Sequence, residues 1–225
     1  KFLSIAGSNL DEFFMARVGS LYNENLADPD ETDNKTGLTA AKQLDGICDV
    51  TKEFYADRSS CFKQLSKELS KNGIRFLRAV HFTPWQKKEC KAIFMSRILP
   101  LLSLLVLDAK HPLMQFENMR SYMLFDLEKN GRRMVGVMAI NPALDRLYKI
   151  GGGENTRLVA LEELVRAFGH HAFIGYTVNG KMMMRVTRNA DFDTQIDDAD
   201  LECDFSAIMK KKVESRARLN IVRLE

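Results

Sequence analysis

The sequence predicts two domains of different class: a helical bundle over residues 1–73, then an α+β domain over residues 74–225 with a mainly antiparallel sheet. Three observations lead to this prediction. Residues 39–71 have apolar side chains on one side, which is typical of an amphipathic helix of roughly 50 Å that needs packing partners along its length. Asn72-Gly73 ends that pattern. Beyond it, strand-like runs flank Asn130-Gly131, the dipeptide most typical of a two-residue hairpin turn.

Composition and charge are typical of a globular protein and limit the partners that the chain can be expected to bind. Hydrophobic residues make up 45% of the 225 residues and charged residues 28%, and the net charge of +3 is too small to indicate nucleic acid or a membrane surface. Because the net charge is small, we expect no nucleic-acid partner. No apolar run approaches the ~20 residues of a spanning helix, so we also expect no transmembrane segment. The chain starts at Lys1 within a helix-like pattern, so we expect a fragment whose first domain is incomplete at its start.

The first 26 residues predict two helical pieces. Residues 1–6 read as the end of one helix and residues 8–26 as a second, with Ser8 as N-cap and Asp11 closing a capping box. The apolar face of the second helix consists of Leu10, Phe13, Phe14, Val18 and Leu21. Asn9 has no packing role in this pattern. Its amide both donates and accepts, which suits the edge of a purine, although a cap or turn role explains an Asn equally simply.

The remaining elements follow in order. Residues 27–37 predict an exposed loop, and Thr83-Pro84 with Gln86 predicts a helix start that leads to residue 98. A further helix is expected over 161–168, and a turn at Asn179-Gly180. The other expected strands cover 74–77, 101–107, 121–140 as a hairpin, 147–150, 182–187 and 220–224, and a last helix covers 198–218.

The residues alone offer no catalytic set. The four cysteines, Cys48, Cys61, Cys90 and Cys203, and the four histidines, His81, His111, His170 and His171, have neither metal-ligand nor redox spacing. Gly151-Gly152-Gly153 lacks the rest of a phosphate-binding motif and is interpreted as a turn. Two features leave alternatives open. Arg188 can bind phosphate or pair with Asp191, and the basic run from Lys210 to Arg218 can bind a polyanion or form a solvated helix face.

Three stretches, in order along the chain, resemble the polyphosphate kinase family of bacteria. The first is Lys1-Phe2-Leu3 through Ser8-Asn9-Leu10-Asp11-Glu12-Phe13-Phe14-Met15-Ala16-Arg17-Val18. The second is His111-Pro112 with Phe116, and the third is Met184-Arg185-Val186-Thr187-Arg188-Asn189-Ala190-Asp191. The chain differs from the family pattern at Gly7, Ala16 and Leu113-Met114, none of which replaces a chemically distinctive side chain.

This resemblance implies an ATP–polyphosphate phosphotransferase, a cytoplasmic enzyme either free or membrane-associated. The family reversibly moves the terminal phosphate of ATP to inorganic polyphosphate through a phosphohistidine, with Mg2+, and carries that histidine and the metal ligands in C-terminal domains. The present chain then corresponds to the N-terminal helical domain and the head domain, inactive alone. Asn9 is the position that carries over as a nucleotide contact, and the head domain implies a homo-oligomer. The alternative is a scaffold, dimerisation or polyanion-binding module without catalysis.

Overall fold

The computed structural model describes residues 1–108, 114–152, 155–190 and 219–225. Two compact units account for the chain. Unit 1 contains Lys1–Ser60, Gln115–Met119 and Val186–Leu224, and unit 2 contains Cys61–Met114, Arg120–Arg185 and Glu225. Within the described residues, no helix is both long enough and apolar enough to cross a membrane.

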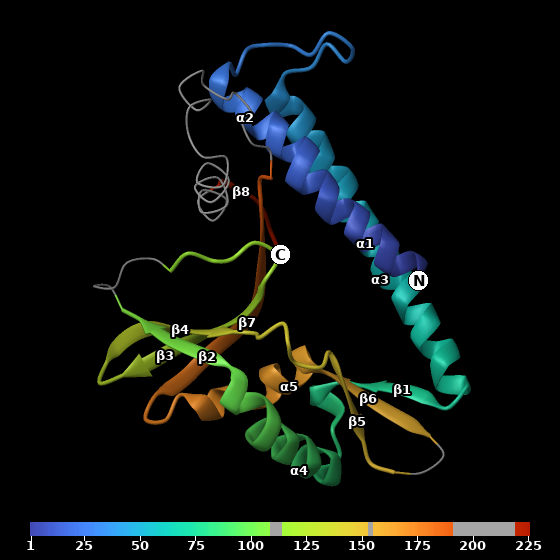
Figure 1. Cartoon of the computed structure of the whole chain (residues 1–225), viewed down its shortest axis with the longest axis vertical. Helices are drawn as coiled ribbons and strands as arrows, with labels where there is room; N and C mark the ends of the chain where they lie inside the picture. The colour runs from blue at the N-terminus through green and yellow to red at the C-terminus, as the bar shows by residue number, and fades with distance from the viewer. Residues whose placement is uncertain (109–113, 153–154, 191–218) are drawn as a thin grey trace, which may run out of the picture. The chain divides into compact units, whose positions relative to one another are not determined.

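Unit 1 is built on helices near the N-terminus. Helix α1 (Phe2–Phe13) continues through the π-helical turn η1 (Phe14–Val18) into α2 (Gly19–Ala27), and the first part of α3 (Ala40–Lys71) runs beside it (Figure 1). The prediction of a helix start at Ser8 was therefore wrong. The apolar stretch of residues 2–6 and the motif after it form one continuous helix, because the backbone hydrogen bonds continue through Ser8 and no Pro interrupts them.

The long helix α3 agrees with its prediction to within one residue at the start, and it ends at Lys71. Asn72 and Gly73 follow, and Gly73 takes the left-handed conformation (φ +78°) that Gly adopts without steric cost. Ala40 is the single residue of α3 that is buried. The apolar stripe that marked this helix in the sequence is therefore largely unburied in the described structure.

Unit 2 contains two sheets. Strands β2 (Ser103–Leu107), β4 (Arg132–Ala139), β3 (Ser121–Lys129) and β7 (Thr177–Arg188) pair in that order, all antiparallel. The predicted hairpin is present, with Asn130 and Gly131 both at positive φ, as a type I′ turn requires. A second sheet has the order β1 (Ile74–Leu77), β6 (Thr156–Ala160) and β5 (Leu147–Ile150). Its β1–β6 pair is parallel and β6 was not predicted.

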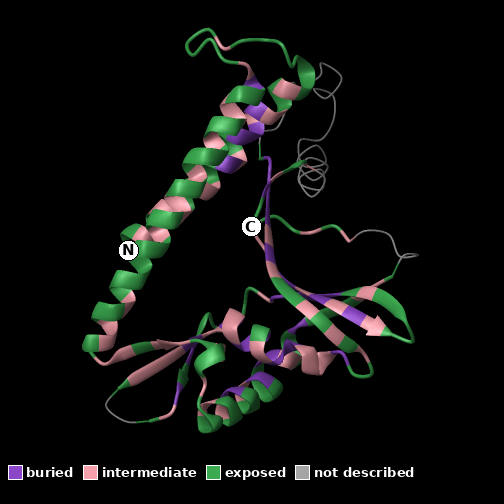
Figure 2. Cartoon of the chain, turned by 180° about the vertical axis from the view of Figure 1, so that it is seen from behind, coloured by how far each residue is buried: buried purple, intermediate pink, exposed green. Residues whose placement is uncertain are grey.

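The core of unit 2 lies where helices α4 (Pro84–Ile93) and α5 (Leu161–Phe168) meet the sheets, as the buried residues in Figure 2 show. The Thr83 capping box is formed as predicted, and α4 is followed by a π-helical turn over Phe94–Ile98 and a 3-10 turn over Leu99–Leu101. Two predictions were wrong. Asn179-Gly180, expected to form a turn, lies inside β7 at a register shift. The apolar run of residues 98–107 predicts a buried strand, but β2 is an edge strand on which Leu104 and Leu105 are over 40% exposed.

At its C-terminal end, within unit 1, β7 pairs with β8 (Ile221–Leu224) in antiparallel register. The predicted fold class is confirmed: helices come first, followed by a domain whose sheet is mostly antiparallel. The predicted helix over 198–218 and the segment around His111 lie outside the described residues.

Candidate functional site

Asn9 lies in the middle of α1, exposed, and its amide has no hydrogen-bond partner among the residues that the structure describes. Asp11 lies two positions further along the same helix. Because successive residues of an α-helix are about 100° apart, the side chains of Asn9 and Asp11 leave the helix on nearly opposite sides. The helix can therefore be held by one side while Asn9 remains accessible on the other.

An ion pair holds the Asp11 side of the helix. The Arg223 guanidinium, on β8, donates a hydrogen bond to the Asp11 carboxylate, and the two side chains are only 6% and 17% exposed respectively. The same guanidinium lies 4.7 Å from the ring centroid of Phe14, within reach of a cation–π interaction. Asp11, predicted to close a capping box, thus has a tertiary role that its position in a helix-start motif did not indicate.

The π-helical turn η1 supplies the next connection. A π turn widens the helix by one residue and disturbs the regular pattern of carbonyl acceptors. Here the backbone N–H of Ala190, just after β7, donates to the carbonyl oxygen of Met15 at 2.9 Å. The buried side chain of Asn189 donates through Nδ2 to the carbonyl oxygen of Gly19 at 3.3 Å. Two helix carbonyls are therefore used to bind the chain that leaves β7.

Gly19 makes this approach possible. A Cβ atom at this position would lie 2.1 Å from the Oδ1 atom of Asn189, far inside van der Waals contact. The constraint comes from space alone, because Gly19 itself has helical backbone angles. The sequence carried a signal for this contact, namely a glycine inside a helical pattern, which usually reflects close packing.

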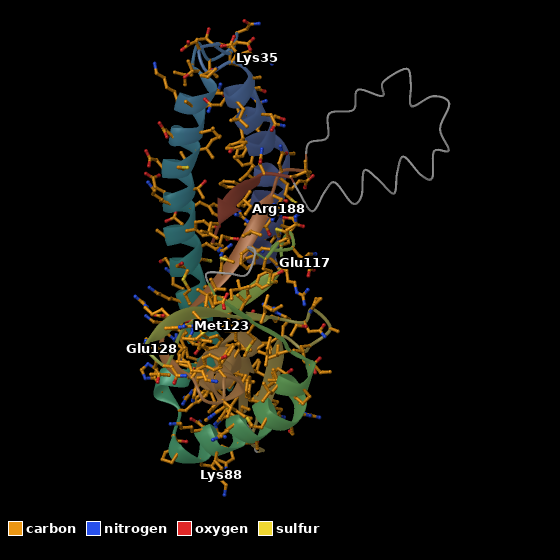
Figure 3. All side chains as sticks on the ribbon, turned by 90° about the vertical axis from the view of Figure 1, so that its left-hand side faces the viewer. Lys35, Lys88, Glu117, Met123, Glu128 and Arg188 are labelled. Carbon is orange, nitrogen blue, oxygen red and sulfur yellow. The ribbon has the colours of Figure 1, made fainter. Side chains whose placement is uncertain are left out.

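Arg188 has a structural role. Its side chain is 8% exposed, and Nε and Nη1 donate to the carbonyl oxygens of Phe116 and Leu219 at 3.0 and 2.6 Å. Its backbone N–H donates to Oδ1 of Asn118 at 2.8 Å. These contacts account for the guanidinium without phosphate, and Asp191, the other predicted partner, lies outside the described residues. Arg188, labelled in Figure 3, therefore holds three chain segments together.

An apolar groove runs between α1 and α3 in unit 1. Its volume is about 480 Å3. Residues of both helices and of the turn before α3 line it: Leu10, Phe13, Leu38, Lys42, Gln43, Gly46, Ile47, Val50, Thr51 and Phe54. Asn9 does not line the groove, although the next residue, Leu10, does. Phe13, predicted to be part of the apolar face, remains 39% exposed, whereas Phe14, Val18 and Leu21 are buried.

The described residues contain no group of three or more His, Cys, Asp or Glu side chains that could hold a metal ion. Burial raises the pKa of the Cys90 thiol to about 11, aided by the nearby charge of Glu89. Cys48 and Cys61 are exposed free thiols, and Cys203 lies outside the described residues.

Both the N-terminal and the C-terminal part of the chain match models of known protein domains. Residues 1–77 match the model of the polyphosphate kinase N-terminal domain, and residues 85–225 match the model of the polyphosphate kinase middle domain. The chain therefore belongs to the polyphosphate kinase family, as its sequence motifs had indicated.

Individual relatives agree with this assignment. A polyphosphate kinase of an Exiguobacterium species is 33% identical over 195 residues, which covers 85% of this chain and 27% of the relative. That of Bacillus anthracis is 31% identical over 233 residues, covering 100% of this chain and 33% of the relative. The crystal structure of polyphosphate kinase from Porphyromonas gingivalis shares the fold, with a TM-score of 0.69, 20% identity, and coverage of 97% of this chain and 33% of that one. The chain thus spans about a third or less of the proteins it matches.

Proposed function

We propose that this chain is the non-catalytic N-terminal part of an enzyme that reversibly transfers the terminal phosphate of ATP to inorganic polyphosphate. The observation that carries the proposal is the match of two successive family models to residues 1–77 and 85–225. In this proposal the phosphohistidine lies in domains of the whole protein beyond this chain. We also propose the domain division 1–73 and 74–225, a homo-oligomer formed through the second domain, and a cytoplasmic enzyme.

Asn9 is the residue that we propose to contact the nucleotide base. Its exposed amide on α1 can both donate and accept, as a purine edge requires. The anchoring contacts of Asp11, Met15 and Gly19 support this proposal because they hold the helix that carries Asn9. We propose that the ligands of the enzyme's Mg2+ lie in the rest of the whole protein, since the described residues contain no group of three or more His, Cys, Asp or Glu side chains that could hold a metal ion.

Two measurements test the proposal. The intact mass of the native protein in its source cell should far exceed 25.7 kDa, and that protein should synthesise polyphosphate from ATP while the 225-residue chain shows no turnover. A native mass close to 25.7 kDa would reject the enzyme assignment.

Substitution of Asn9 tests the nucleotide contact. In the whole enzyme, Asn9→Ala should raise the KM for ATP several-fold, since about one hydrogen bond to the base is lost, and should leave the melting temperature unchanged. Glu12→Gln, another exposed change on the same helix, is the matched control and should alter neither quantity. An unchanged KM in the Asn9→Ala enzyme would contradict the assignment of Asn9, and would leave the family assignment standing.

A further inference from the structure

The two units differ strongly in charge. Unit 2 contains 20 Lys and Arg residues against 10 Asp and Glu, a net charge of +10, whereas unit 1 contains 13 against 20, a net charge of −7. The overall charge of +3 conceals this difference. A net charge of this size on one folded unit attracts anions over the range of the Debye length, about 8 Å at physiological ionic strength.

Part of this positive charge is concentrated around one histidine pair. His170 and His171, in the 3-10 turn η5 (Gly169–Ala172) that follows α5, have ring centroids 4.1 Å apart, and the ring of His171 is nearly parallel to that of Phe168. Lys91 of α4 and Lys181 of β7 are close enough to act electrostatically on His170, and Lys91 also acts on His171. We call Lys91, His170, His171 and Lys181 the basic cluster. Lys91 on α4 lies 79 positions before His170, whereas η5 and β7 follow each other closely in the chain.

The ammonium groups of the basic cluster have no carboxylate partner among the described residues. Lys181 donates from Nζ to the carbonyl oxygen of Arg166 at 2.6 Å, which uses one of its three N–H groups. Lys91 is exposed and forms no ion pair in the described part of the chain. On α5, Glu163 is already engaged: it lies 3.9 Å from Arg166 and accepts a hydrogen bond from the backbone N–H of Ala79.

The pKa values of both imidazoles are lowered from the ordinary value of histidine, chiefly by burial. Burial lowers the pKa of His170, and the charges of His171, Lys181 and Lys91 lower it further, against a backbone hydrogen bond at Ala167 that raises it. Burial, followed by the charge of Lys91, lowers the pKa of His171. An anion bound between the lysines would oppose these charges and favour the imidazolium form. Binding of a polyanion would therefore raise the pKa of the imidazoles and increase the positive charge of the cluster.

We propose that the basic cluster is a binding site for inorganic polyphosphate on unit 2. Lys91 and Lys181 would contact successive phosphates of one chain, with the histidine pair between them. Lys87 and Lys88, exposed one turn earlier on α4, would extend the contact, and Lys88 points away from the ribbon in Figure 3. The identity of the polyanion rests on the proposed function, whereas the position of the site rests on the placement of charges in unit 2.

Binding to the 225-residue chain tests the site directly. Labelled inorganic polyphosphate of defined length should bind with an affinity that falls steeply with salt. Lys91→Gln/Lys181→Gln should weaken binding by about tenfold at low salt and reduce the salt slope by about two. Gln keeps a hydrogen-bond donor toward the Arg166 carbonyl. Lys63→Gln/Lys67→Gln on α3, two exposed lysines of the same unit, is the matched control, and its affinity should change by less than about twofold.

Several outcomes would overturn the proposal. The first two are an absence of polyphosphate binding and an equal loss of affinity in the two double variants. The other two are displacement of polyphosphate by orthophosphate at an equal concentration of phosphate groups, and equally tight binding of a single-stranded oligonucleotide of matched charge. The histidine pair offers a separate readout that does not depend on the lysine variants folding. Proton NMR titration of the wild-type chain should show the pKa of His170 rising when polyphosphate is added, and an unchanged pKa would reject the site.

Discussion

The carboxylate of Asp11 on α1 accepts a hydrogen bond from the guanidinium of Arg223 on β8, joining residues 212 positions apart. Both side chains are largely buried, and Arg223 also covers the ring of Phe14. This pair, together with the Met15–Ala190 and Gly19–Asn189 contacts, connects the first family motif to the last one in unit 1. Asp11, predicted from the sequence to close a capping box, therefore helps to hold the helix that carries Asn9.

Removing one member of the Asp11–Arg223 pair should destabilise unit 1. We expect Asp11→Ala to lower the free energy of unfolding by about 3 kcal/mol, because it leaves the buried Arg223 guanidinium without its carboxylate. Denaturant titration monitored by circular dichroism measures this. Asp11→Ala/Arg223→Met should recover most of the loss, since the methionine keeps apolar contact with Phe14. If the double variant is no more stable than Asp11→Ala, the pair is not the origin of the loss.

Two glycine substitutions should change the stability of the protein in opposite directions. Gly19→Ala should destabilise by about 2 kcal/mol, because its Cβ would overlap Asn189 Oδ1, and overpacking at a tight site costs 1–3 kcal/mol. Gly46→Ala on α3 meets no atom within 4 Å and should stabilise by about 0.5–1 kcal/mol through helix propensity. Thermal unfolding of both variants gives the comparison. A stabilised Gly19→Ala protein would show that Asn189 can move aside without cost.

Thiol reactivity should separate the cysteines. The pKa of about 11 at Cys90 leaves almost no thiolate at pH 8, whereas Cys48 and Cys61 are exposed on α3. Brief treatment with iodoacetamide, followed by peptide mass spectrometry, should therefore find Cys48 and Cys61 alkylated and Cys90 unmodified. All three should react in guanidinium chloride. Rapid labelling of native Cys90 would mean that the core around α4 opens readily.

Stability should decline on the acidic side of neutrality. The pKa values of His170 and His171 are lowered in the folded state, chiefly by burial. At pH values between these lowered pKa values and the ordinary 6.5, the unfolded chain therefore binds more protons than the folded chain. Their contribution to stability is fully present above pH 6.5 and is lost as the pH falls through this window. His170→Gln/His171→Gln should show a flatter pH dependence from pH 7 to pH 5. An identical slope in wild type and variant would assign the acid sensitivity to other groups.

Elements with local signals were predicted well. The Thr83 capping box, the Asn130-Gly131 hairpin and the end of α3 at Asn72-Gly73 are each decided within about five residues, by capping bonds or by positive φ angles. The errors occurred where distant chain segments compete with local preference. Ser8 is a good N-cap residue, yet α1 runs through it; Asn179-Gly180 suits a turn, yet it remains in β7, paired with β3.

The sequence by itself determined the order of helices and strands, the antiparallel character of the main sheet and, through three motifs in order, the family. These properties rest on periodicity and on residues within one turn of each other. Only the tertiary structure decided that Asp11 pairs with Arg223, that Gly19 admits Asn189, and that Lys91 and Lys181 lie close to one histidine pair. The Asp11–Arg223 and Gly19–Asn189 contacts join residues 212 and 170 positions apart, and Lys91 lies 79 positions before His170. The energies of such contacts depend on distance and burial in three dimensions, which no local pattern encodes.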